Sequence, residues 1–307
     1  MWTPSWFFAG IRLMGMRSIV TLFFLALIST PLIQADPQPQ PGILAPGKDW
    51  EPLGQGYQLT ADTAVDREGL VYFTDVRHNR IHKIDLQGKI TVWKEESSGA
   101  HGVACGPDGR LYVAQHDRKR IVAFTPDGKE SVVAEDVQTH HLTVTERNDV
   151  YFADAPNHKI WLVDRAGNKR VVSGDLNWPH GLRASPDQSI LVVNDPPRRW
   201  VWTFQIQRDG SLANGRPFYR LEAPDESSET DAGGMTFDTV GFLYVATMQD
   251  VQVFDAAGRM VVIINTPGKD GVSNVFFGGP DMQWLFVTDG DKMYRRLTTR
   301  RGAAAWK

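Results

Sequence analysis

Short apolar runs separated by turn residues recur along most of this chain. Each run holds four to six residues that are mainly β-branched or aromatic, which is the composition of β-strands. Turn signals such as Pro107-Asp108-Gly109 precede the runs, because Pro presets φ, Asp bonds its own backbone and Gly accepts positive φ. No stretch shows a long helical period. The runs lie at 70–75, 111–115, 150–154, 190–195, 243–247 and 285–289.

Further strands complete each repeat. A third strand follows each run, as at 80–85 and 159–164, and a fourth is visible at 90–93 and 260–264. Four strands in a repeat of about 40 residues are typical of a propeller blade, so the six repeats predict an all-β, six-bladed β-propeller of four-stranded blades. The ring must close, because an open sheet edge invites pairing with other chains. The last repeat is short, so residues 50–57 are expected to supply its outer strand.

The first residues of the chain differ from the repeats. Arg12 and Arg17 precede an apolar run at 19–28, and Ala35 stands at a cleavage position, which is the layout of a secretory signal peptide. The run is short for a membrane span, and an uncleaved signal anchor is the alternative. We therefore expect a secreted or periplasmic protein. Its expected divisions are a signal peptide at 1–35, a flexible leader rich in Pro and Gln at 36–49, and the propeller at 50–307.

Charge and cysteine content narrow the class of partner. The chain has 33 basic and 36 acidic residues, and removal of residues 1–35 takes away two arginines and no acid, so the net charge changes from −3 to 31 − 36 = −5. This balance does not indicate a nucleic acid or an anionic surface as partner. Cys105 is the only cysteine, so no internal disulfide can form. We expect no stable membrane insertion after signal cleavage, and the sequence does not indicate an oligomeric state.

Three of the eight histidines occupy one position of the repeat. His140 lies 39 residues after His101 and 40 residues before His180. Innermost strands of a propeller surround a central channel, so equivalent positions at their starts point to a common axis. Neutral imidazole is the commonest transition-metal ligand, and three His with an open water position form a catalytic zinc site. We therefore predict a divalent metal on these three residues, most simply Zn, with Mn, Fe or Ni as alternatives. The six projected positions are Ala61, His101, His140, His180, Gly233 and Asn274.

Two other interpretations of these histidines stay open. They could hold neighbouring blades together by hydrogen bonds, or act as a metal-free acid–base pair. Around them, Asp62, Asp195 and Asp231 are candidate proton-transfer residues, although Asp195 could instead cap a turn. The candidate substrate-binding residues are His141, Arg183 and Asn274, and the remaining histidines, His116 among them, are expected on the surface or facing a loop.

Four sets of stretches form an ordered pattern along the repeats: Thr60–Asp66 with Val71–Asp75, Pro179–Leu182 with Ser185–Asp187, Gly234–Asp238 and Asn274–Gly279. With them the chain resembles the SMP-30/gluconolactonase/LRE-like family of six-bladed propellers over about residues 50–297. The resemblance implies a lactonase or esterase that holds calcium or another divalent ion near the channel mouth, on a Glu of the first blade, Asn residues of middle blades and an Asp of the fifth.

This chain departs from the family at those ligand positions. Ala61 stands at the Glu position and Gly233 at the Asp position, while histidines stand at the middle positions. Calcium prefers oxygen ligands, so calcium is the less favoured metal here. The predicted reaction is hydrolysis of a sugar-lactone-like lactone or an ester, a small-molecule substrate, by metal-activated water. The alternatives are a metal-dependent lyase acting on a uronate-like or other carbonyl-activated substrate, and a non-catalytic binding propeller.

Overall fold

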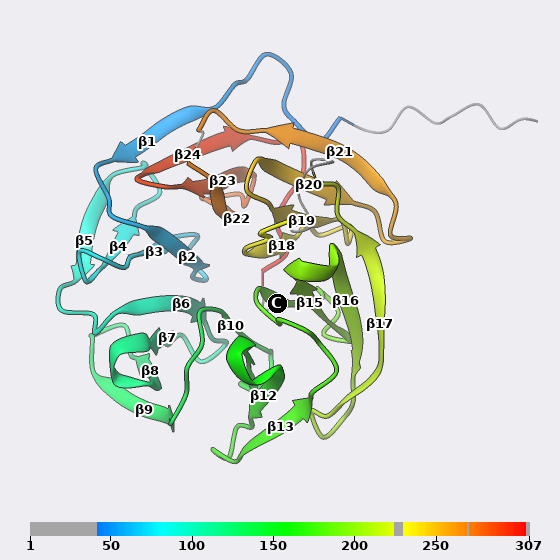
Figure 1. The fold of residues 1–307 in the computed structure, drawn as a ribbon. Helices are drawn as coiled ribbons and strands as arrows, with labels where there is room; N and C mark the ends of the chain where they lie inside the picture. The colour runs from blue at the N-terminus through cyan, green and yellow to red at the C-terminus, as the bar shows by residue number, and fades with distance from the viewer. Residues whose placement is uncertain (1–41, 224–229, 269, 305–307) are drawn as a thin grey trace, which may run out of the picture. The chain divides into compact units, whose positions relative to one another are not determined.

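The computed structural model describes residues 42–223, 230–268 and 270–304, so the expected signal peptide lies outside the described residues. Six antiparallel four-stranded sheets stand around a common axis (Figure 1). The prediction of an all-β, six-bladed propeller of four-stranded blades is confirmed. In five blades the strands follow one another from the axis outward: β2–β5, β6–β9, β10–β13, β14–β17 and β18–β21.

The strands are short, as the apolar runs predicted. Three single-turn 3-10 helices follow second strands: η1 (His116–Arg118), η2 (Ala155–Asn157) and η3 (Pro196–Arg198). The strands are β1 (Glu51–Gln55), β2 (Thr60–Val65), β3 (Val71–Asp75), β4 (Arg80–Ile84), β5 (Ile90–Lys94), β6 (Ala100–Cys105), β7 (Leu111–Gln115), β8 (Arg120–Phe124), β9 (Glu130–Glu135), β10 (Leu142–Val144), β11 (Val150–Asp154), β12 (Lys159–Val163), β13 (Lys169–Ser173), β14 (Leu182–Ala184), β15 (Ile190–Asp195), β16 (Trp200–Ile206), β17 (Leu212–Arg220), β18 (Met235–Phe237), β19 (Leu243–Ala246), β20 (Asp250–Phe254), β21 (Met260–Asn265), β22 (Val272–Gly278), β23 (Trp284–Asp289) and β24 (Lys292–Leu297).

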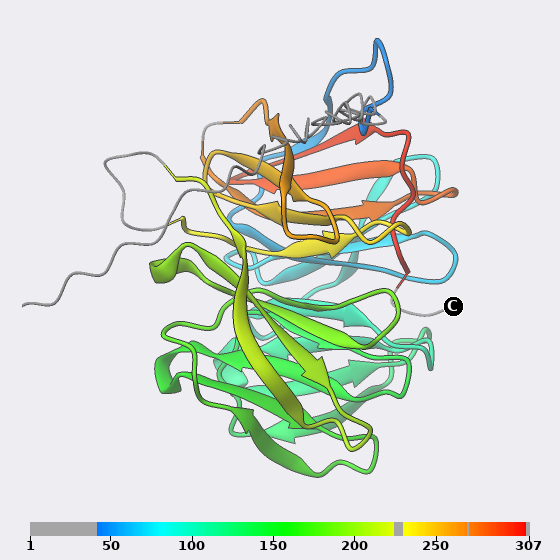
Figure 2. The same cartoon turned by 90° about the vertical axis from the view of Figure 1, so that its right-hand side faces the viewer.

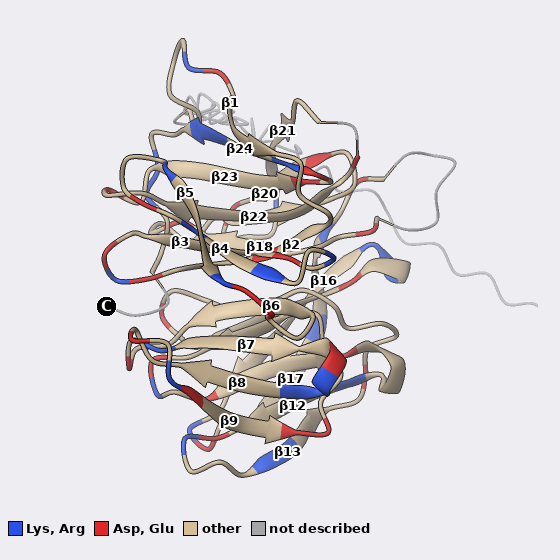
Figure 3. Ribbon diagram, turned by 90° about the vertical axis from the view of Figure 1, so that its left-hand side faces the viewer, with Lys and Arg blue, Asp and Glu red and all other residues tan. Residues whose placement is uncertain are grey.

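Burial along each blade follows its distance from the axis. Every residue of β7 and β11 is buried, because blades cover both faces of a second strand, whereas most of β9 is exposed. Charged residues of both signs accordingly lie mainly on outer strands, at strand ends and in turns (Figure 3). The core is therefore divided among the interfaces between neighbouring blades rather than gathered in one place.

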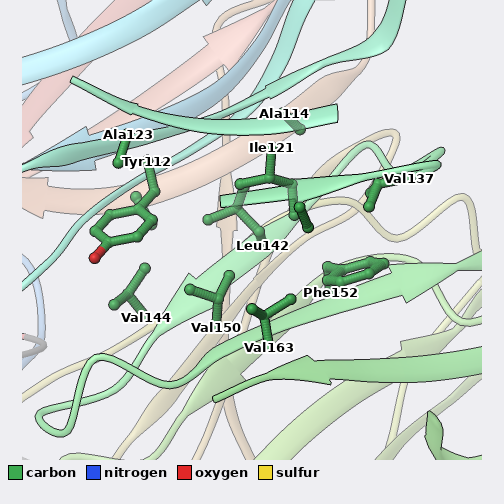
Figure 4. Close-up of a cluster of buried hydrophobic side chains, with 12 residues drawn as sticks. Tyr112, Ala114, Ile121, Ala123, Val137, Leu142, Val144, Val150, Phe152 and Val163 are labelled. Carbon is green, nitrogen blue, oxygen red and sulfur yellow. The ribbon is translucent and has the colours of Figure 1, made fainter. Parts of the chain in front are cut away.

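One such interface joins the second and third blades (Figure 4). Tyr112 and Ile121 of the second blade face Leu142, Val150 and Phe152 of the third, and all five are at most 4% exposed. Burying a side chain of this size contributes about 1.5–3 kcal/mol. These contacts fix the innermost strands β6 and β10, which carry three of the clustered histidines at their starts.

The N-terminal strand closes the ring. β1 pairs antiparallel with β24, so the last blade has the order β1-β24-β23-β22. This confirms that residues 50–57 supply the outer strand. The packed chain also extends to the N-terminal side of the propeller boundary expected at residue 50: Ile43 is 6% exposed, and Leu44 bridges to Thr298.

The C-terminal residues reach the axis on one face of the ring (Figures 1 and 2). Ala303 donates a backbone hydrogen bond to the Phe237 carbonyl, and Ala303 and Ala304 line a cavity of about 30 Å³ between innermost strands. This end of the channel is narrow, so substrate access is expected from the opposite end. Within the described part of the chain, no helix is long and apolar enough to cross a membrane.

Candidate functional site

Strand pairing shows which residues of the innermost strands are equivalent. Thr143 pairs with Tyr151 in the third blade, and Arg183 pairs with Val192 at the same step in the fourth. The corresponding residues of the other blades are Ala64, Ala104, Thr236 and Phe276. The residues two positions earlier form a second level of the innermost strands: Asp62, Gly102, His141, Gly181, Gly234 and Asn274. The residues one position before these form the ring at the strand starts: Ala61, His101, His140, His180, Gly233 and Ser273.

The sixth ring position therefore needs a correction. Ser273, and not Asn274, is equivalent to the three histidines. The Ser273 hydroxyl donates to the Thr60 carbonyl at 2.6 Å and lies 2.7 Å from the Thr288 hydroxyl, so it joins strands of neighbouring blades. Asn274 lies one step deeper, on the same level as Asp62 and His141.

Five imidazole rings gather at the start of the second, third and fourth blades. The His101 and His140 rings stack with centroids 4.3 Å apart and an angle of 20° between their planes. His116, at the start of η1, lies 5.4 Å from His140 and 6.2 Å from His101. His180 contacts His141 edge to face at 4.6 Å. The structure thus brings the three predicted histidines together and adds His141 and His116.

These rings stand beside a cavity at the channel mouth. The cavity is about 240 Å³ and is lined by His101, His141, His180 and Asp231 among others. A second hollow of about 410 Å³ shares His180 and Asp231 with it and extends to Trp178. His140 is not among the residues that line the mouth cavity, although it stands in the ring.

Asp62 is the carboxylate that the structure places against the cluster. Its Oδ1 accepts hydrogen bonds from the Thr63 N–H at 2.8 Å and from the Asn274 amide. Its Oδ2 accepts from the Val103 N–H at 3.2 Å and lies 3.5 Å from His141 Nδ1. Asn274 is buried and its amide donates to Asp62, so it helps to position this carboxylate, and its contact with substrate stays a prediction.

Burial keeps the ring histidines neutral. The pKa of His101 is lowered to about 2, mainly by burial and secondly by the charge of the neighbouring His140. The pKa of His180 is lowered to about 3, mainly by burial and secondly by His141. The same two causes, in the same order, lower the pKa of His140 to about 4. His180 Nδ1 lies 3.2 Å from the Ala232 carbonyl, which fixes the ring against the fifth blade.

The free energy of unfolding is expected to fall as the pH drops below the ordinary pKa of histidine. In the unfolded chain His101 and His180 take up protons near that pH, whereas their folded pKa values are about 2 and 3. The unfolded state therefore binds more protons throughout the interval, and these two residues contribute a loss of roughly 2 kcal/mol between about pH 6.5 and 5.5, to which His140, with a folded pKa of about 4, adds roughly 1 kcal/mol. Urea unfolding at the two pH values measures this loss.

Two variants separate this effect from general acid sensitivity. The double variant His101→Gln/His180→Gln should lose most of the slope. His158→Asn changes an exposed histidine with positive φ, which Asn tolerates, and should keep the slope. An unchanged slope in the double variant would contradict the assignment.

The histidine ring fits a metal ion in its donor type but not in its geometry. Neutral imidazoles are suitable donors for zinc. However, nitrogen lone pairs lie in the plane of the imidazole ring, and the stacked rings of His101 and His140 hold theirs in two nearly parallel planes that do not meet at one ion. Across residues 42–223, 230–268 and 270–304, no three His, Cys, Asp or Glu side chains are placed so that they could hold a metal ion. The side chains as arranged do not form the predicted three-histidine centre, and zinc on His101, His140 and His180 stays a prediction.

A calcium centre fits no better. Ala61 and Gly233 carry no side-chain oxygen, and the oxygens of Asp62 are already bonded to backbone and side-chain donors. Calcium needs six to eight oxygen ligands.

Asp195 holds the loop that leads to His180. It is fully buried, and its oxygens accept the Asn177 and Trp178 N–H groups at 3.1 and 2.8 Å. These hydrogen bonds favour the interpretation of Asp195 as a cap for backbone N–H groups, and its role in proton transfer stays a prediction.

Arg183 and Asp231 lie at opposite ends of the site. Arg183 lines the narrow cavity with Thr143 and Thr236 and is not among the residues that line the mouth cavity, and its contact with substrate stays a prediction. Burial lowers its pKa, and the charge of Asp62 opposes this. Asp231 is exposed with φ at 43° and borders both mouth cavities, so it stays a candidate for contact with substrate or solvent protons.

His116 is the functional candidate that the sequence did not single out. Its Nδ1 and that of His101 are buried without a hydrogen-bond partner among the described residues. The sequence feature that could have identified His116 is its position directly after a second strand, where η1 begins. The residue at the same place is Pro196 in the fourth blade, which borders the mouth hollow.

Comparison with known proteins gives consistent matches. Residues 60–290 match the SMP-30/Gluconolactonase/LRE-like region. The pentonolactonase XacC of Haloferax volcanii is 25% identical over 237 residues, covering 73% of this chain and 80% of the relative. The gluconolactonase of Zymomonas mobilis is 24% identical over 231 residues, covering 66% of this chain and 64% of the relative. A gluconolactonase structure from Xanthomonas campestris superposes with a TM-score of 0.72 at 22% identity, covering 84% of this chain and 95% of that one.

Proposed function

This chain belongs to the SMP-30/gluconolactonase/LRE-like family, and we propose that it hydrolyses a lactone or an ester at the mouth of its propeller channel. The observation that carries the proposal is the mouth cavity, into which His141 is presented while Asp62 lies 3.5 Å behind its Nδ1. A buried imidazole backed by a carboxylate can take a proton from water. Two curated relatives named for lactone hydrolysis support the same class of substrate.

The proposed substrate is a small polar ring. The mouth cavity and the hollow beside it, about 240 and 410 Å³, lie in the size range of small-molecule sites. Their walls combine imidazoles and the Asp231 carboxylate with apolar surface from Trp178 and Met248. Hydroxyl groups of a sugar lactone would find hydrogen-bond partners there, and its ring carbons would find apolar contacts.

Ring opening of lactones by the purified chain tests the proposal. We expect five- and six-membered aldonolactones, assayed beside aryl esters by acid release in weak buffer, to open well above their spontaneous rate. Incorporation of ¹⁸O from water into the carboxylate product identifies hydrolysis. No turnover of any lactone or ester would leave the chain as a binding propeller.

A lyase is the second candidate, and the same pair of residues favours it. An imidazole held by Asp62 could also remove a proton from carbon beside a carbonyl group. Elimination would form a double bond that absorbs in the ultraviolet and would incorporate no ¹⁸O. A uronate-containing substrate that gives this result would replace hydrolysis as the assigned reaction.

We also propose that the protein acts outside the cytoplasm, as its signal-like first 35 residues predict. The N-terminal sequence of the protein recovered from the periplasm or medium is expected to begin at Asp36. Recovery of the uncleaved chain with the membrane fraction would contradict this.

A further inference from the structure

His141 differs from the other clustered histidines in its partner. Among the five described rings of the cluster, it is the one with a carboxylate within ion-pair distance, at 3.5 Å from Asp62. It is 7% exposed, yet it lines the mouth cavity beside His101 and His180. One edge of the ring therefore faces a fixed anion, and the ring itself borders the space that substrate would enter.

Asp62 is held in a single orientation. Two backbone N–H groups, from Thr63 and Val103, and the Asn274 amide donate to its two oxygens, and it is 6% exposed. A carboxylate fixed 3.5 Å from Nδ1 favours the imidazole tautomer with a proton on that nitrogen, which leaves the Nε2 lone pair basic. Asn274 and the start of β6 thus determine the state of a side chain in a third blade.

Arg183 supplies a counter-charge from the narrow end of the channel. Asp62 is the charge that most opposes the lowering of the Arg183 pKa by burial. Among the described residues, none accepts a hydrogen bond from Arg183. The guanidinium therefore interacts with Asp62 only by long-range electrostatics, and the Asp62 oxygens stay bonded to Thr63, Val103 and Asn274.

We propose that His141 is the general base of this centre, that Asp62 is its positioning carboxylate, and that the chemistry needs no resident metal ion. The proposal rests on the lactone or ester hydrolysis proposed above. It follows from the failure of the ring histidines and of the oxygen groups to converge as a ligand set, beside a pair that is already arranged for proton transfer.

The reaction balances with this pair alone. Water attacks the carbonyl carbon while His141 Nε2 takes its proton, and the tetrahedral intermediate carries the negative charge on the former carbonyl oxygen. The ring C–O bond then breaks, the leaving oxygen takes the proton back from His141, and the hydroxy acid releases its carboxyl proton to solvent. Asp62 stabilises the imidazolium between the two steps.

Kinetics of matched variants test the assignment. His141→Gln and Asp62→Asn should each lower kcat roughly 10²- to 10⁴-fold with a much smaller change in KM. Exogenous imidazole should restore part of the rate of His141→Gly, because the cavity borders the vacated position. The exposed control His158→Asn should keep the wild-type rate, as should wild-type protein after exhaustive dialysis against chelators. Wild-type kcat in His141→Gln, or loss of activity on chelation that added metal restores, would overturn the proposal.

Nitrogen-15 NMR of labelled histidines gives a readout that does not depend on turnover. We expect one histidine with its proton on Nδ1 and a strongly downfield proton signal, which His141→Gln removes and Asp62→Asn shifts. Circular dichroism of both variants checks that they fold. If the wild type opens no lactone or ester, hydrolysis as the function fails, and the NMR result still decides the pair: an Nε2 proton on His141 would overturn it.

Discussion

A chain that lacks residues 42–56 is expected to lose most of its folding stability. The deletion removes β1, which pairs with β24, and so leaves an unpaired edge on the last blade. It also removes Ile43, Leu44 and Trp50 from the core cluster between the fifth and sixth blades, and Leu53 from the cluster between the sixth and first. We expect a loss of more than about 5 kcal/mol, which is comparable with the whole stability of many domains. Urea unfolding followed by near-ultraviolet circular dichroism measures it.

Two controls show whether strand closure causes the loss. A synthetic peptide of residues 42–56 should bind the shortened chain and restore its cooperative transition. Glu51→Gln removes the 3.0 Å ion pair with Arg295 but keeps the strand, and because Glu51 is half exposed we expect a change of at most about 1 kcal/mol. A shortened chain that unfolds with the wild-type midpoint would show that the other three strands complete the last blade alone.

The ring architecture followed from the sequence because strand composition and turn residues recur at a nearly constant interval. Second strands such as β7 and β11 are covered on both faces, so they are apolar throughout and do not alternate between apolar and polar residues. The need for closure then pointed to residues 50–57. Strand pairing and burial impose the same residue types at the same positions of each repeat, so the sequence shows both of them several times.

The level of each site residue was harder to assign. Side chains alternate between faces along a strand, so a shift of one residue exchanges the channel-facing residue for its neighbour. Asn274 was assigned to the ring for this reason, where Ser273 stands. Pairing of Phe276 with Phe286 and of Asn274 with Thr288 fixes the level, and this information is not local to the innermost strand.

Hydrogen-bond partners explain the other differences. Asp75, Asp195 and Asp289 each end a second strand and accept backbone N–H groups from the loop before their own innermost strand. Their recurrence at one repeat position was a sign of structure rather than chemistry. Asp62 and Asn274 pair across 212 residues, and His116 approaches His101 only because η1 turns back over the mouth. Residue type and spacing do not encode such contacts.

Gly181→Ala is expected to destabilise the fourth and fifth blades and to displace His180. A Cβ at Gly181 would lie 2.1 Å from the Gly233 carbonyl oxygen and 3.0 Å from Asn194 Nδ2. Asn194 joins the two blades, because it accepts from the Gly181 N–H at 2.8 Å and donates to the Gly233 carbonyl at 2.6 Å. Backbone cannot yield as a flexible side chain can, so we expect a loss of about 3 kcal/mol in the free energy of unfolding.

The matched substitution is Gly174→Ala, in the exposed segment between β13 and β14. No heavy atom lies within 4 Å of a Cβ at Gly174, so the change should stay within about 0.5 kcal/mol. The two variants differ in what the added methyl group meets, and their difference in urea midpoint isolates the close approach of the innermost strands. Equal midpoints would mean that the blades can separate at Gly181 without cost. The ring spacing that holds His180 beside His141 would then be set by the loops rather than by the strands.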